Sequence, residues 1–217
     1  MNAVVSSIYG DYDRLVAPVE QREPCEFILV SDREYDVPGW KVVVEPRPHM
    51  HPRFAAKVAK CLPGLYTKAE RVVWMDGSMR VMSPDCVSWL IEAAGTHVLA
   101  QFGHPSWKTL HMEAQVAGGM DKYKGQPLRA QADYYRGQGY PDDFGHWETG
   151  VIVYNRAHTW LDEFGWRWLA EQARWTYEDQ LSEGPLLWAL GRKPFTLPHK
   201  MRSNGYFEVR GHPNDLK

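Results

Sequence analysis

The residue types best suited to chemistry follow an apolar run in the first half of the chain. The run 72–75 (Val-Val-Trp-Met) leads directly into Asp76, Gly77 and Ser78. A carboxylate and a hydroxyl so spaced can both reach a hard divalent cation that carries a nucleoside diphosphate. A structural alternative exists, because Asp-Gly between apolar runs is a strong signal for a hairpin turn. The two interpretations are compatible, since a turn at a strand end is where such a ligand set would lie.

Three basic residues fall on one face of a predicted helix. Arg53, Lys57 and Lys60 are separated by four and three positions, so their side chains are neighbours on the helix surface. On a surface helix they would form a solvated stripe. If the same face lines a cleft, its fixed cations would stabilise a leaving diphosphate.

Two acidic residues in the second half could act on a sugar or an acceptor hydroxyl. Glu148 lies between aromatic residues and a glycine, just before the apolar run 151–153. It could orient the acceptor or act as a base, or it could cap a helix or pair with Arg156. Asp179 begins a predicted helix, where capping alone would explain it. A carboxylate at that position also suits hydrogen bonding to a sugar.

The nine histidines are scattered, and no pair has the spacing of a strong metal site. A single histidine near the C-terminus can still complete an oxygen-ligated site, which makes His199 and His212 candidates. The chain lacks the glycine-rich dinucleotide fingerprint, the P-loop, the Gly-x-Ser-x-Gly nucleophile motif and Cys-x-x-Cys. Common dinucleotide, kinase and hydrolase functions therefore lose support.

Composition limits the class of protein further. The chain has 217 residues with 44% hydrophobic content, enough for one domain with its own core, and a formal net charge of −2 argues against a nucleic-acid partner. Three dispersed cysteines suit a reducing compartment. No apolar run is long enough for a transmembrane segment. We expect a cytoplasmic monomer or small homo-oligomer.

These residues are positioned by alternating strands and helices. Apolar runs predict strands at 3–9, 25–31, 40–45, 71–75, 79–82, 97–102 and 150–154. Helical patterns predict helices at 52–62, 83–94, 106–117, 123–136, 157–173 and 178–190. This alternation favours a single α/β sandwich domain over 1–217 with a mostly parallel central sheet, in which sites collect at the carboxyl ends of strands. Residues 194–217 are predicted to be a polar C-terminal tail that wraps over the domain.

Six short motifs in a fixed order resemble one known family. They are Ile-Tyr-Gly-Asp-Tyr-Asp at 8–13, Lys-Cys-Leu-Pro at 60–63, Trp-Met-Asp-Gly-Ser at 74–78, His-Met-Glu-Ala at 111–114, Glu-Thr-Gly-Val-Ile at 148–152 and Glu-Asp-Gln-Leu-Ser at 178–182. Over roughly residues 3 to 190 the chain resembles the glycosyltransferase-like domain, formerly of unknown function, of plant cell-wall, bacterial and phage proteins. The resemblance implies a GT-A fold, a UDP- or GDP-linked sugar donor and Mn²⁺ or Mg²⁺ as cofactor.

The resemblance also implies roles for individual residues. Tyr9, Gly10 and Asp11 would form the nucleotide-binding loop after the first strand. Asp76 and Ser78 stand at the family's acidic motif, although Asp-Gly-Ser lacks the second carboxylate of Asp-x-Asp, which weakens the expected metal affinity. Lys60 matches a family lysine. His104 and Glu113 match the segment after the central strand, where they would shape the donor-sugar pocket. Glu148 and Asp179 match the acids expected to face the acceptor and the sugar, and the adjacent Gln180 is a further candidate for cofactor binding.

The leading hypothesis is a metal-assisted transfer of a sugar from a nucleotide donor to a hydroxyl on a protein, glycan or lipid. Glu148 or Asp179 would be the base if the reaction inverts configuration. One alternative is a metal-dependent hydrolase that activates water with Asp76, Glu113 and a histidine. Another is a carbohydrate-binding or assembly protein on a degenerate transferase fold, suggested by ten tryptophans and the reduced acidic motif.

Overall fold

The computed structural model describes residues 1–211 and contains a seven-stranded sheet in the order β3-β2-β1-β4-β7-β6-β8. The strands of this sheet are β1 (Asn2–Ile8), β2 (Cys25–Ser31), β3 (Lys41–Val44), β4 (Arg71–Met75), β6 (Leu99–Gly103), β7 (Trp147–Asn155) and β8 (Phe195–Leu197). Only β7 runs antiparallel to its two neighbours, β4 and β6. The predicted α/β sandwich with a mostly parallel sheet is confirmed.

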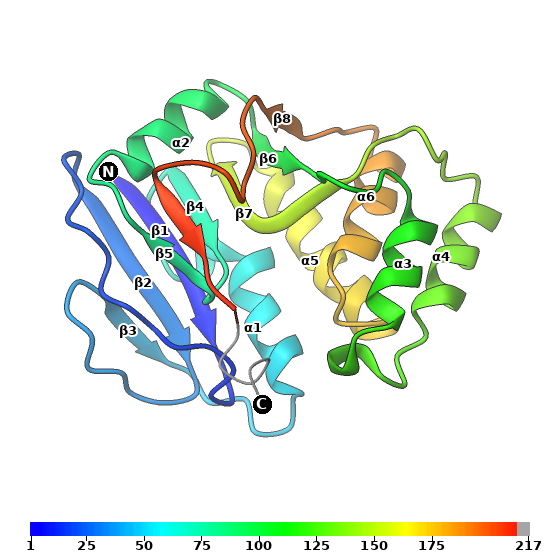
Figure 1. Ribbon diagram of the computed structural model, residues 1–217, viewed down its shortest axis with the longest axis horizontal. Helices are drawn as coiled ribbons and strands as arrows, with labels where there is room; N and C mark the ends of the chain where they lie inside the picture. The colour runs from blue at the N-terminus through cyan, green and yellow to red at the C-terminus, as the bar shows by residue number, and fades with distance from the viewer. Residues whose placement is uncertain (212–217) are drawn as a thin grey trace.

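Helices cover both faces of this sheet (Figure 1). They are α1 (Pro52–Cys61), α2 (Cys86–Ala94), α3 (Leu110–Gly118), α4 (Leu128–Gly137), α5 (Trp160–Arg174) and α6 (Gln180–Ala189), with short 3-10 turns η1 (Pro63–Leu65) and η2 (Asp121–Tyr123). Helices α1, α5 and α6 pack on one face and α2 packs on the other. Helices α3 and α4 lie side by side at one end of the molecule, around a small core of their own (Figure 1). None of the helices in residues 1–211 is long and apolar enough to cross a membrane.

The central strands are mainly apolar because helices cover both faces of the sheet. In β4, Val72 and Trp74 belong to the core under α1 and α5, whereas Val73 and Met75 belong to the core under α2. Successive side chains of a strand point to opposite faces, so a strand between two helical layers needs a hydrophobic residue at every position.

The C-terminal segment is more than the tail that its polar sequence predicts. Phe195–Leu197 forms β8 at the edge of the main sheet, and β9 (Phe207–Val209) pairs antiparallel with β5 (Met79–Val81) in a separate two-stranded sheet. Unpaired edge strands offer backbone groups that a short apolar triplet can satisfy. This pairing also shows that the Asp76–Gly77 turn is not a hairpin, because β5 pairs with β9 and not with β4.

Five of the six predicted helices begin later than expected, and the two largest shifts have local reasons. The helix expected at 123–136 begins only at Leu128, because Gly125, with φ +81°, and Pro127 interrupt the chain. The helix expected from residue 106 begins at Leu110, where the Thr109 side chain accepts a hydrogen bond from the Met112 backbone N–H.

Gly165 allows α5 to approach α1 closely. A Cβ atom at this position would lie 2.1 Å from the backbone oxygen of Cys61, a distance that only a backbone shift could relieve. We expect Gly165→Ala to lower the free energy of unfolding by about 1–3 kcal/mol through overpacking, as measured by urea denaturation. Gly137→Ala is the matched control, because nothing lies within 4 Å of its added Cβ; it should change stability by less than about 1 kcal/mol. Equal effects of the two substitutions would contradict this account of the α1–α5 contact.

Candidate active site

A cleft of about 940 Å³ lies at the edge of the sheet where β1, β4 and β6 end and β7 begins. Parallel strands bring the loops after their carboxyl ends to one edge, which is where α/β proteins bind ligands. Of the residues with predicted roles, those lining the cleft are Tyr9, Arg53, Lys57, Asp76, Ser78, His104, Glu113, Glu148, Asp179 and Gln180. Segments far apart in the sequence therefore meet at one site.

A buried ion network forms the wall of the cleft under Asp76. The Lys60 ammonium, whose side chain is 1% exposed, lies 3.2 Å from Asp76 Oδ1 and also pairs with Asp179 Oδ2. Lys57 Nζ lies 3.0 Å from the same Asp179 oxygen. The Trp74 indole N–H donates a hydrogen bond of 2.8 Å to Asp76 Oδ1. One oxygen of Asp76 is thus fixed from behind, while its side chain remains 38% exposed at the cleft.

This network decides between the structural and functional interpretations of the basic helix face. Lys57 and Lys60 do not form a solvated stripe, because both point at Asp179. Lys60 does not line the cleft but lies beneath Asp76, so its contact with a leaving diphosphate would be indirect. Arg53 faces the cleft, with its guanidinium 3.5 Å from the centre of the Tyr12 ring.

The two lysines keep Asp179 ionised. Burial would raise the pKa of Asp179, but the charges of Lys57 and Lys60 hold it below its usual value. Burial would likewise lower the pKa of Lys57, and Asp179 raises it above the ordinary range. Asp179 is the N-cap residue of α6, yet its side chain makes no capping hydrogen bond. Helix capping therefore does not explain this carboxylate.

Glu148 is a buried acid of the predicted set that pairs with an exposed arginine. The register of β7 against β6 shifts between Gln101 and Phe102, so that Glu148 lies opposite Phe102 within β7 and not before the strand as predicted. Such irregularities re-aim side chains next to sites. Burial raises the pKa of Glu148, against the opposing effect of Arg202, whose Nε lies 3.5 Å from Glu148 Oε1. The predicted alternative partner, Arg156, instead donates to the backbone carbonyls of Thr67 and Ala69.

Glu113 holds together a group of rings after β6. Its Oε2 accepts hydrogen bonds from the Trp107 indole and lies 3.0 Å from His146 Nε2 and 4.0 Å from His104 Nε2. His104 Nδ1 accepts from the backbone N–H groups of Ser106 and Trp107, so the neutral ring carries its proton on Nε2. Burial and the nearby His146 lower the pKa of His104 to about 4. His104 is therefore a neutral histidine in the lining of the cleft at neutral pH.

The loop after β1 meets the cleft at Tyr9, as predicted, but not at Gly10 or Asp11. The Tyr9 hydroxyl donates to the Glu45 carbonyl and accepts from Arg47. Gly10 and Asp11 do not line the cleft; the Gly10 N–H donates to Asp32, and Asp11 pairs with an arginine outside it. Tyr12 and Asp13, a few residues further along, lie at the cleft instead.

The predicted metal ligands are only partly brought together. Asp76 and Ser78 line the cleft, whereas the His199 ring packs against Trp89 of α2, 4.9 Å between ring centres, and does not line it. His212 lies outside the described residues. Within residues 1–211 no three His, Cys, Asp or Glu side chains are grouped as a metal site. Asp76, with Oδ1 held by Trp74 and Lys60, offers Oδ2 as a single carboxylate ligand.

Other cleft residues carry charge that the sequence did not single out. Glu178 is buried beside Asp179, and burial together with the charges of Asp179 and Glu113 raises its pKa to about 8. Glu178 directly precedes the predicted site residue Asp179 in the Glu-Asp-Gln motif, so the sequence did contain a signal for it. Arg202 and Arg210, from the C-terminal segment, and Lys122 of η2 also line the cleft. No periodicity or motif marks these three cations.

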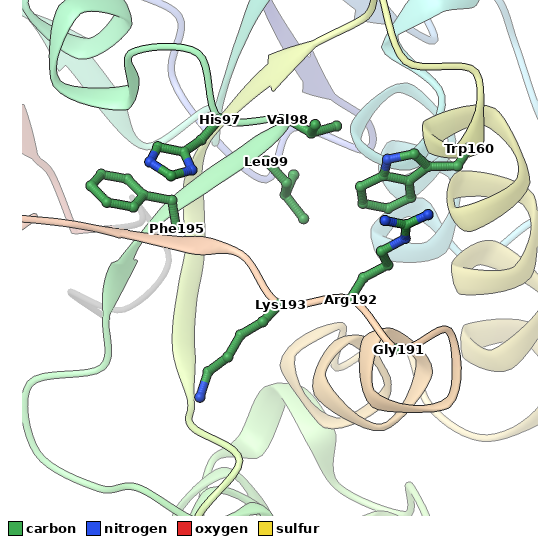
Figure 2. Close-up of a pocket in the computed structure, with 8 residues that line it drawn as sticks. All are labelled: His97, Val98, Leu99, Trp160, Gly191, Arg192, Lys193 and Phe195. Atoms are coloured by element: carbon green, nitrogen blue, oxygen red, sulfur yellow. The ribbon is translucent and has the colours of Figure 1, made fainter.

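A second, smaller cavity of about 260 Å³ opens near the start of β6, away from the cleft. Figure 2 shows Trp160 with Arg192 on one side of it and the stacked rings of His97 and Phe195 on the other. Its lining residues include no carboxylate. The larger cleft is therefore the candidate active site.

A buried carboxyl group of α6, that of Glu183, should make the free energy of unfolding depend on pH. Burial and the Asp179 charge raise the pKa of Glu183 from 4.5 to about 8. Because the unfolded chain ionises first, the free energy of unfolding should fall as the pH rises from about 4.5 to about 8. Glu183→Gln should reduce this fall, as measured by urea denaturation across the range, and the similarly shifted Glu178 should account for part of the remainder. The lowered pKa of Asp179 acts in the opposite sense, and only at pH values near and below its ordinary 3.8.

The matched control for this measurement is Glu163→Gln. Glu163 is an exposed residue of α5 that pairs with Arg167 one turn away, so its substitution should leave the pH dependence of stability unchanged. The same pH slope in the wild type and in Glu183→Gln would show that Glu183 does not cause the effect.

The comparisons with known proteins agree with this geometry. The family model described as TOD1/MUCI70, glycosyltransferase-like domain, matches residues 25–201. A solved structure titled as the apo form of WbbM, a bifunctional glycosyltransferase, is similar with a TM-score of 0.53 and 14% sequence identity. The match covers 90% of this chain and 38% of that one, so the chain spans well under half of its length. At this identity the likeness is one of fold. No curated protein matches the chain.

Proposed function

Because the chain belongs to the TOD1/MUCI70 glycosyltransferase-like family, we propose that it transfers a sugar from a UDP- or GDP-linked donor to a hydroxyl group. The observation that carries the proposal is the composition of the cleft. One open carboxylate, Asp76, lies in the same cavity as several cations and the buried acid Glu148. A glycosyl transfer needs cations for the leaving diphosphate and a polar group for the acceptor hydroxyl.

The donor half of the reaction is assigned to the side of the cleft near β1, β4 and α1. Arg53, Arg202 and Arg210 line the cleft and can pair with phosphate oxygens. The free oxygen of Asp76, together with the Ser78 hydroxyl, suits a divalent cation such as Mn²⁺ or Mg²⁺, whose other ligands would come from the diphosphate and water. Such an ion, when bound, would supply Lewis-acid stabilisation of the leaving group. Lys60 contributes by holding Asp76 in place and not by touching the diphosphate.

The acceptor half is assigned to Glu148. Of the two predicted acids, Asp179 is neutralised by Lys57 and Lys60 and has a lowered pKa, which makes it a weak proton acceptor. Glu148 has a raised pKa because it is buried, and a base is more effective as its pKa approaches the working pH. If the transfer inverts configuration, Glu148 would take the acceptor proton. Asp179 instead organises the lysines.

The neutral ring of His104 is suited to the donor sugar. Its Nε2–H faces a cleft in which Glu113 and His146 fix the neighbouring groups. A neutral donor in a fixed position can hydrogen-bond a sugar hydroxyl without adding a charge. The acceptor remains open among a protein, a glycan and a lipid headgroup.

Nucleotide binding provides the first test. Calorimetry with UDP and with GDP should show binding of at least one of them, strengthened by MnCl₂. Asp76→Asn should remove the manganese-dependent gain, because a neutral amide is a poorer ligand than a carboxylate. Asp162→Asn, on the first turn of α5, serves as the control and should bind like the wild type. Failure of the wild type to bind either nucleotide would sink the assignment of the donor.

Turnover provides the second test. Glu148→Gln should lower kcat for hydrolysis or transfer of the donor sugar by about 10²–10⁴-fold, the usual contribution of a general base. Nucleotide affinity should change much less, since the carboxylate is assigned to the acceptor side. Full activity of Glu148→Gln would remove Glu148 as the base. Donor-sugar turnover itself would also separate a transferase from a protein that only binds carbohydrate.

A further inference from the structure

The C-terminal segment places one arginine where it can contact both halves of the proposed reaction. Met201 is buried, and its side chain packs against Gly150 of β7. The Gly150 carbonyl accepts a hydrogen bond of 2.9 Å from the Asp76 backbone N–H. Arg202 therefore follows a residue anchored next to the Asp76 turn. Its own side chain lines the cleft and pairs with Glu148, which lies two residues before Gly150 on β7.

The backbone around Arg202 is held while its side chain is free to move. The Asn204 side chain donates to the Met201 carbonyl over 2.8 Å and accepts from the backbone N–H groups of Tyr206 and Phe207. The Arg202 side chain is 65% exposed, compared with 7% for Glu148. Its one ion pair among the described residues is a single contact of 3.5 Å. An ion pair with so exposed a partner is weak.

A diphosphate is a stronger partner for this arginine than Glu148 is. It carries more negative charge than one carboxylate and presents oxygens that a guanidinium can bind in a bidentate manner. We propose that Arg202 is a positioning residue that exchanges partners: it pairs with Glu148 without donor and moves to the diphosphate when the donor binds, which releases Glu148 for the acceptor hydroxyl. This inference rests on the proposed function. Binding of the donor would then prepare the base for the second substrate.

The charged groups around Glu148 determine what this exchange does to it. From the loop after β6, His104 lines the same cleft, and its ring lies beside Glu113 and His146. From α6, the neutral Gln180 side chain accepts from the Thr149 N–H beside Glu148. Burial raises the pKa of Glu148, and Arg202 is the charge that lowers it. Removal of Arg202 from Glu148 therefore favours proton uptake by Glu148.

The test is calorimetry of the whole protein with UDP, GDP and inorganic pyrophosphate in buffers of different ionisation enthalpy. This measurement gives both the affinity and the number of protons taken up on binding. The wild type should take up more protons on binding than Glu148→Gln. This variant lacks the carboxylate, so its proton uptake measures the titration of the ligand alone. Arg202→Gln should bind the diphosphates about tenfold more weakly and show the same proton count as Glu148→Gln. Arg202→Lys should recover part of both effects.

Arg167→Gln is the control for the loss of an exposed arginine. Arg167 pairs with Glu163 on α5 and does not line the cleft, so this variant should match the wild type in affinity and proton count. Thermal denaturation should show that all variants are folded. Wild-type affinity in Arg202→Gln, or equal proton counts in the wild type and Glu148→Gln, would overturn the exchange and leave the proposed function standing. Failure of all three ligands to bind the wild type would overturn both.

Discussion

The ion network of Lys60 with Asp76 and Asp179 is the constraint on which the candidate site depends. A fully buried ammonium is costly unless carboxylates surround it, and here two of them do, one at the end of β4 and one at the start of α6. Lys57 adds a second cation on the same side of Asp179. The network therefore links α1, β4 and α6, and it fixes one oxygen of the Asp76 carboxylate at the cleft.

The sheet around this network has the order and direction that place the other groups beside it. The ends of β1, β4 and β6 meet at one edge, and the antiparallel β7 begins there. Glu148 enters the cleft from β7 only because the register against β6 shifts next to it. The Glu113 group then closes the cleft from the side of α3. The cleft thus results from the direction of the strands and from the register shift between β6 and β7, and the buried ion pairs of Asp179 fix the groups beneath it.

Much of the fold could be predicted from the sequence, because strands buried on both faces are marked by continuous apolar runs. The strand at 25–31 and the strand at 71–75 have the bounds that their apolar residues predict. The C-terminal strands could not be found in this way, since triplets such as Phe195–Leu197 are too short to show a period and depend on a partner edge distant in sequence. The helix at 52–61 was visible from its periodicity, but the sequence did not show whether its basic face was solvated or buried.

The candidate site was predictable to the extent that its residues follow strands or begin helices. Asp76, Glu148 and Asp179 meet at the cleft as their positions suggest. The assignment of His199 to the metal was not supported, because an isolated histidine carries no information about the face on which it will lie. Arg202 was missed for a similar reason, since its importance comes from the path of the C-terminal segment across the sheet.

The two-stranded sheet of β5 and β9 makes one side of the cleft different in structure from the side formed by α1. The wall on α1 belongs to the main core and is clamped by buried charges, whereas the opposite wall is a ribbon of two three-residue strands joined by few backbone bonds. Val81 and Phe207 of the ribbon are buried in the core under α2, so only its exposed positions, such as Arg80 and Glu208, can change at little cost to the domain. The sequence can therefore vary at these outward positions while the buried charges beneath Asp76 are retained.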